Sequence, residues 1–206
     1  GFTYSYSQDI TVSKEAKDYF LELAFSVDYG DNSNNIKKWS QYIKIYPIYD
    51  DVKPGMSSAL SYELGKVLKD LNPLTNNIKL HLVSSIDEAN LIVFLGSGEE
   101  YVSRIEPNAK DYVKDNAGLF WCYWDENYEI LKASMYVDTT KIKHNSIAQH
   151  ILRENLTQCL GLLRKSDKYP RSIFYKGSST ISLYQPIDRM VIQILYHNKI
   201  KPGMMS

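Results

Sequence analysis

The chain has 206 residues, 44% of them hydrophobic, which is enough to build the core of one globular domain or at most two small ones. Lys and Arg together number 24, as do Asp and Glu, so the formal net charge is zero and no basic field favours nucleic acid or anionic lipid. No apolar run approaches the roughly 18 residues that span a bilayer. We therefore expect a single domain over residues 1–206, without a nucleic-acid partner or a transmembrane segment.

The N-terminal part predicts a loose arm followed by a helix. Residues 1–12 are polar and aromatic without a helical period. Ser13 is a typical N-cap, and apolar side chains follow it at helical spacing as far as Ala24. The turn-rich residues 28–31 end this helix, so residues 13–35 are expected to form an N-terminal helix and a linker.

Three strands and one helix are expected in the next part of the chain. The strands are residues 39–48, 78–83 and 91–95. The third is entirely apolar, which is typical of a strand buried on both faces. The helix lies between the first two strands and is predicted to be capped by Ser57 and stopped by Asn72-Pro73.

The glycines at 96 and 98 predict a break, followed by a polar loop to about Asn116. Two strands and two helices are then expected, over residues 118–124, 129–137, 147–160 and 186–196. Ser146 is predicted to cap the first of these helices and Gly161 to follow its end, while Pro186 opens the second. This order favours an α+β fold, in which a mixed sheet of four to five strands has its helices packed on one side.

The helix predicted at 147–160 and the turn after it resemble the zinc motif H-E-x-x-H-x-x-G-x-x-H/D of the metzincin peptidases. Gly161 aligns with the glycine of the motif. Counting from it, Glu154 and Gln158 stand at the two helical ligand positions, Asn155 at the general-base position and Arg164 at the third ligand position. The spacing of the motif, which we call its frame, is therefore kept, whereas its zinc-binding histidines and its general base are replaced.

Other segments extend this resemblance over about residues 36–197. Ser172-Ile173-Phe174 is similar to the Ser-Ile-Met turn beneath the metal, and Asp188 with Tyr196 resembles the end of matrixin-type domains. The resemblance implies a zincin-like, metzincin-type domain with a backing helix and a degenerate active-site helix. In it, Gly161, Ser172, Asp188 and Tyr196 would be structural.

A closer resemblance covers nearly the whole chain and is to family 2927 of domains of unknown function. It rests on Lys38-Trp39, the Glu154 to Leu162 segment, residues 172–174 and the ending at residues 195–204. These are exported bacterial proteins, some of them lipoproteins, so the resemblance implies a periplasmic or lipid-anchored protein. The chain begins at Gly1 without a signal peptide, which we interpret as processing or truncation of a precursor.

The substitutions argue against a zinc cofactor. The amide oxygen of Gln158 is a poor zinc ligand, and Arg164 is a permanent cation. His150, Glu154 and Gln158 are spaced by four and would form one helical stripe, which could bind a metal with help from elsewhere. We favour the alternative that His150 and Glu154 pair with each other or with groups of the sheet, and we expect no cofactor.

For the two cysteines and the aromatic residues of the predicted edge strand, we favour structural roles. Cys122 and Cys159 form no CxxC pair, so two independent buried thiols are favoured over one disulfide. Trp121 and Tyr123 lie on the strand expected at the cleft edge, where they could stack on a peptide or sugar, although core packing is favoured for each.

Three functions remain open from the sequence. The leading hypothesis is a non-catalytic protein that binds an extended peptide or an envelope partner in the former cleft. Its candidate cleft residues are His150, Glu154, Gln158, Trp121, Tyr123 and Phe174. The first alternative is a hydrolase or peptidase with Glu154 as acid–base and His150 as an auxiliary group. The second is a structural envelope protein.

Overall fold

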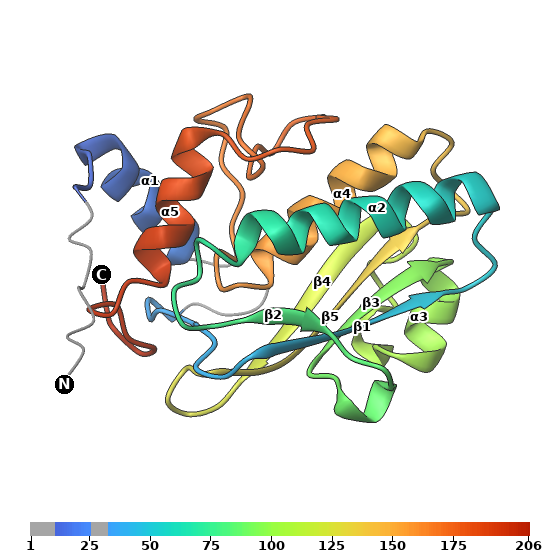
Figure 1. The fold of residues 1–206 in the computed structure, drawn as a ribbon, viewed down its shortest axis with the longest axis horizontal. Helices are drawn as coiled ribbons and strands as arrows, with labels where there is room; N and C mark the ends of the chain where they lie inside the picture. The colour runs from blue at the N-terminus through green and yellow to red at the C-terminus, as the bar shows by residue number, and fades with distance from the viewer. Residues whose placement is uncertain (1–10, 26–32) are drawn as a thin grey trace, which may run out of the picture.

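The computed structural model describes residues 11–25 and 33–206. Most of the arm predicted for residues 1–12, and the turn predicted at 28–31, lie outside the described residues. Five strands form one sheet in the order β2-β1-β3-β5-β4, and their bounds are Ile43–Tyr49 (β1), Leu80–Leu82 (β2), Leu91–Gly96 (β3), Gly118–Trp124 (β4) and Ile130–Asp138 (β5). Four strands run parallel, while β4 is antiparallel to β5 and lies at the edge (Figure 1). The sheet confirms the predicted mixed α+β fold.

Helices cover both faces of this sheet. Their bounds are Lys14–Ala24 (α1), Pro54–Leu71 (α2), Gly98–Arg104 (α3), Asn145–Gln158 (α4) and Pro186–Leu195 (α5), with short 3-10 turns at Ile86–Glu88 and Pro107–Ala109. Helices α2 and α4 lie side by side on one face, α3 lies on the other, and α1 packs against α5 at one end (Figure 1). The expectation that all helices pack on one side was therefore wrong.

Helix α3 explains this correction. Ser97 stands where a break was predicted, but its Oγ accepts a hydrogen bond from the Glu100 N–H (3.1 Å) and so caps a helix. Tyr101 of that helix is fully buried against Phe94 and Tyr136, which point away from α2 and α4. A seven-residue helix with a single buried anchor shows no periodicity that a sequence reading could detect.

Several boundaries also differ from the expected ones. Helix α2 begins three residues before Ser57, because Pro54 occupies its first turn, where the fixed φ of proline fits. Helix α4 begins at Asn145, after His144 and not after Ser146. Strand β1 begins only at Ile43. The Ser13 cap, the β4–β5 hairpin and Pro186 at the start of α5 are confirmed.

Trp39, expected in the first strand, instead ties the sheet to the end of α4. Its side chain is fully buried, and its indole Nε1–H donates to the carbonyl of Cys159 (2.8 Å). A buried indole N–H needs such a partner. The Lys38-Trp39 pair thus fixes the helix end that precedes Gly161.

Lys38 makes the stability of the fold depend on pH. Its Nζ donates to the carbonyl of Ile200 (2.8 Å), and burial, with the charge of Lys201 as a smaller cause, lowers the pKa of Lys38 to about 8. An unfolded chain keeps this pKa near 10.4, so the unfolded state binds more protons between the two values and the free energy of unfolding rises with pH there. We expect the protein to gain about 1–2 kcal/mol between about pH 7 and pH 9.5, and the Lys38→Met variant to lack this gain. Urea unfolding across that range measures it, and parallel pH profiles for the two proteins would contradict it.

Candidate functional site

A cavity of about 730 Å³ follows the edge strand β4. One wall is the segment before β4, with Asn108, Tyr112 and Asn116. The other wall is α4 and the chain that follows it, with Asn155, Gln158, Leu163, Lys165 and Lys176. The strand supplies the floor, through Gly118, Leu119, Phe120, Trp121, Cys122 and Trp124. We call this cavity the β4 groove.

Side chains of β4 alternate between the two faces of the sheet. Phe120, Cys122 and Trp124 pack toward the α4 side, whereas Leu119 and Trp121 pack toward α3. Trp121 contacts Tyr112 edge to face (5.8 Å between ring centroids) and lines the groove. Tyr123 also points away from α4, and its side chain contacts the groove wall that is formed by the segment before β4.

The contacts of Tyr123 fix that wall. Its hydroxyl donates to Oε2 of the buried Glu106 (2.7 Å) and accepts from Nδ2 of Asn108 (3.1 Å). Burial and the Glu106 carboxylate raise the pKa of Tyr123, so the hydroxyl keeps its proton. The sequence placed Tyr123 in the cleft, but its hydroxyl is used to hold the Asn108 segment beside β4.

Among the residues that the structure describes, no strand pairs with the outer edge of β4. The amide of Asp138 donates to the carbonyl of Ala117 (2.7 Å), so these two residues form a hydrogen-bonded pair at the start of the hairpin. Bonded and non-bonded pairs alternate along an antiparallel ladder. The peptide groups of Gly118, Phe120 and Cys122 therefore point away from β5, into the groove.

The three residues of the stripe predicted on α4, His150, Glu154 and Gln158, contact three different segments of the chain. The His150 Nδ1–H donates to the carbonyl of Ile181 (2.6 Å), and Nε2 of Gln158 donates to the carbonyl of Leu163 (3.4 Å). Glu154 Oε1 lies 2.7 Å from the ammonium of Lys165. The three side chains thus hold separate loops against α4. Neither His150 nor Glu154 lines the groove.

Asn155 and Gln158 are the α4 residues that line the groove beside β4. A Cβ added to Gly118 would lie 2.3 Å from Cγ2 of Ile151 and 3.0 Å from Nδ2 of Asn155, so the glycine is what lets the strand approach the helix. In the part of the chain that the structure describes, Nδ2 of Asn155 and Oε1 of Gln158 are buried without a hydrogen-bond partner. Buried polar groups of this kind are rare in folded proteins and call for a polar partner.

Gly161 and the turn after it are shaped by a close main-chain contact. Gly161 has φ +116°, and a Cβ at this position would lie 2.1 Å from the carbonyl oxygen of Lys37. Only glycine tolerates both conditions. Arg164 follows, with its main-chain amide donating to the carbonyl of Leu23 (3.3 Å), which docks the turn on α1.

Ser172, Asp188 and Tyr196 form the support of that turn. The Ser172 hydroxyl donates to Oδ1 of Asp188 (2.5 Å), whose Oδ2 accepts from the amides of Ile173 (3.1 Å) and Gln185 (2.8 Å). Burial raises the pKa of Asp188, although these hydrogen bonds act against the rise. The Tyr196 hydroxyl donates to the carbonyl of Leu160 (2.8 Å), next to Gly161.

Phe174 and the two cysteines pack within the fold. Phe174 is fully buried and meets Tyr19 edge to face (6.4 Å between centroids), outside the groove. Cys122 and Cys159 are both free thiols. They lie close together, with Sγ of Cys122 3.9 Å from the carbonyl of Cys159, and burial raises the pKa of the Cys159 thiol.

Comparison with known proteins agrees with the resemblance over nearly the whole chain. The family model described as protein of unknown function (DUF2927) matches residues 13–206. The chain belongs to this family. A search of curated proteins finds no match.

Two further observations concern the described part of this DUF2927 member. Over residues 11–25 and 33–206, no three His, Cys, Asp or Glu side chains gather as the ligands of a metal ion would. No helix in the described part of the chain is both long and apolar enough to cross a membrane.

The sequence reading missed one whole wall of the groove. Asn108, Tyr112 and Asn116 were expected in a featureless polar loop, and Lys165 and Lys176 carried no motif. Only the aromatic run at residues 118–124 and the α4 positions gave a signal that could have located the site.

Proposed function

We propose that this DUF2927 family member binds an extended peptide, which adds to β4 as a further strand of the sheet, and that it does so without catalysis. The resemblance to metzincins supplies the frame of this proposal, a helix and an edge strand on either side of a cleft. The altered residues Glu154, Asn155, Gln158 and Arg164 supply the argument against chemistry.

The free edge of β4 is the observation that carries the proposal. An exposed strand edge presents unpaired N–H and C=O groups and is normally covered or blocked, because it pairs readily with other chains. Here the groups of Phe120 and Cys122 open into a cavity with a wall on each side. Such an edge fits main-chain recognition, in which backbone hydrogen bonds give affinity and flanking pockets select side chains.

The groove also suits an extended chain in size and in polarity. At about 730 Å³ it is in the range of pockets that bind ligands of several residues. Asn155 and Gln158 line the groove beside the strand edge, and the unpaired Nδ2 of Asn155 and Oε1 of Gln158 are buried beneath its surface. A peptide paired with the edge of β4 would therefore lie along a wall that includes two amide side chains.

Selection of random linear peptides against the immobilised protein tests the binding function. We expect enriched peptides to be strand formers that compete with one another for one site. Alkylation of Cys122, which lines the groove, provides a blocked form of the protein. Enriched peptides that still bind this blocked form would contradict the proposal.

Zinc content tests the non-catalytic half of the proposal. The ammonium of Lys165 already lies against Glu154, where a metal would need the carboxylate, and Gln158 adds only a neutral amide. We expect protein purified without chelators to contain less than about a tenth of an equivalent of zinc. Stoichiometric zinc that is lost in Glu154→Ala would instead support the hydrolase alternative.

We further propose that the protein is exported and acts in the bacterial envelope, as a periplasmic or lipid-anchored protein. The family resemblance supports this location. The sequence of a longer precursor tests it, because we expect a signal peptide there, followed either by a small-residue cleavage site or by a cysteine that is lipidated. A precursor that continues upstream without such a signal would contradict export.

A further inference from the structure

We infer that the peptide bound in the β4 groove is acidic and turns its carboxylates toward residues 163–176. This inference rests on the proposed function and adds the chemical class of the partner. It follows from the distribution of charge around the groove.

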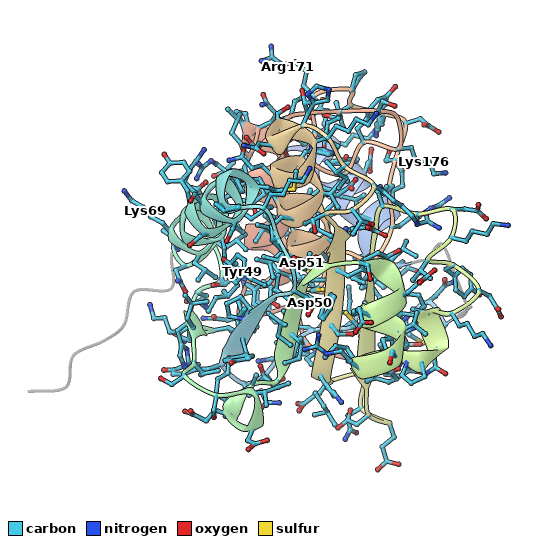
Figure 2. All side chains as sticks on the ribbon, turned by 90° about the vertical axis from the view of Figure 1, so that its right-hand side faces the viewer. Tyr49, Asp50, Asp51, Lys69, Arg171 and Lys176 are labelled. Carbon is cyan, nitrogen blue, oxygen red and sulfur yellow. The ribbon has the colours of Figure 1, made fainter. Side chains whose placement is uncertain are left out.

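The wall that follows α4 is cationic although the whole chain is neutral. Residues 163–176 contain one acidic residue, Asp167, and five cationic ones, Arg164, Lys165, Lys168, Arg171 and Lys176. The formal net charge of the whole chain is zero, so this excess is local. Figure 2 shows Arg171 and Lys176 projecting outward from the molecule, with Lys69 of α2 on the opposite flank.

Two of these cations line the groove itself. Lys165 and Lys176 are among its lining residues, and no Asp or Glu is. Lys165 is held in place by the buried Glu154, which fixes the position of the ammonium on the wall. Lys176 is exposed at the rim.

The lining residues of the opposite wall carry no charge, and along residues 107–116 Asp111 and Asp115 are balanced by Lys110 and Lys114. Its lining residues are the amides of Asn108 and Asn116 and the phenol of Tyr112. The nearby Glu106 is buried and accepts the hydroxyl of Tyr123 on the α3 side. The charge of Lys165 is balanced by Glu154 (2.7 Å), so a carboxylate on the ligand would meet the exposed Lys176 and the polar groups of both walls, whereas a ligand ammonium would be repelled by Lys176.

Binding of short strand-forming peptides tests the inference. The probes are end-capped peptides as long as β4, seven residues, with Val alternating with Glu, Lys or Thr. A fourth probe is the Val/Thr peptide with a free C-terminal carboxylate, which separates side-chain from terminal carboxylates. We expect the Val/Glu peptide to bind about tenfold or more tightly than the Val/Lys peptide at about 50 mM salt, and this preference to fall to about twofold at about 500 mM salt.

Charge reversal at the rim is the matched test on the protein. Lys176→Glu should weaken binding of the Val/Glu peptide about fivefold or more and leave the Val/Thr peptide unchanged. Lys69→Glu makes the same change of net charge on an exposed helical residue away from the groove, and it should change neither.

The outcomes separate this inference from the proposed function. Equal binding of the Glu, Lys and Thr peptides, or a preference for Lys, overturns the acidic ligand while strand addition stands. Tighter binding of the fourth probe than of the Val/Glu peptide assigns the charge to a chain terminus and overturns side-chain carboxylates. Failure of all four peptides to bind overturns both the inference and the proposed function.

Discussion

Replacing Phe120 with proline is expected to weaken peptide binding about 10–100-fold and to leave the protein folded. The Phe120 N–H points into the groove, and proline removes it without breaking a hydrogen bond to β5. Proline is tolerated on an edge strand when its nitrogen faces outward. A main-chain acceptor of the ligand would be left without its donor, which costs about 1–3 kcal/mol when the group is buried.

The Phe120→Val variant is the control for this change, because it shortens the side chain and keeps the N–H. Binding of a selected peptide, measured by calorimetry, should be about 10–100-fold weaker in the proline variant and largely kept in the valine variant. Thermal unfolding of both checks the fold. Equal binding by the two variants would show that the edge of β4 does not carry recognition.

Replacing Arg153 with methionine is expected to destabilise the fold by about 3–5 kcal/mol. Arg153 is fully buried between α4 and α2, where its Nε donates to Oε1 of Glu63 (2.6 Å) and its Nη1 to Oδ2 of Asp70 (2.8 Å). Its guanidinium also lies over the ring of Tyr184, 4.7 Å from the centroid. Removing the cation leaves the buried carboxylate of Glu63 without a partner, which is the costly outcome for a buried pair.

The double variant Arg153→Met with Glu63→Met separates loss of charge balance from loss of packing. Apolar replacement of both partners of a buried pair is often close to neutral, so the double variant should recover most of the stability. Urea unfolding of the three proteins measures this. A single variant that loses less than about 1 kcal/mol would show that Glu63 finds another partner.

The parts of the fold that the sequence predicted are those with strong local signals. Strand β3 is apolar throughout, α2 repeats its apolar residues over many turns, and Gly161 marks a turn that the structure shows only glycine can make. Helix α3 was missed because a short helix depends on one cap, Ser97, and one buried ring, Tyr101. Local periodicity carries no information about an element of that length.

The candidate site was harder to predict because long-range contacts decide it. His150, Glu154 and Gln158 have the spacing of one stripe, yet Ile181, Lys165 and Leu163 each engage a different member. Those partners come from loops whose positions the sequence pattern does not indicate. The same holds for Arg153 and Glu63, which lie 90 residues apart in the chain and meet only because α2 packs on α4.

Three residues that were expected to be structural, Ser172, Asp188 and Tyr196, are buried and hydrogen-bonded. The Ser172 hydroxyl donates to Asp188, and the Tyr196 hydroxyl donates to the carbonyl of Leu160 at the turn after α4. By contrast, Tyr123 and Phe174 are occupied in the walls and core. Packing and turn geometry therefore account for Ser172, Asp188 and Tyr196.

Amide hydrogen exchange along β4, followed by NMR with and without the bound Val/Glu peptide, tests the central claim most directly. The amides of Leu119 and Trp121 belong to the residues paired with β5 and serve as internal references, since their protection should change little. Strand addition predicts that the amides of Phe120 and Cys122 become strongly protected when the peptide is bound. Saturation with peptide that leaves the exchange of Phe120 and Cys122 unchanged would contradict it.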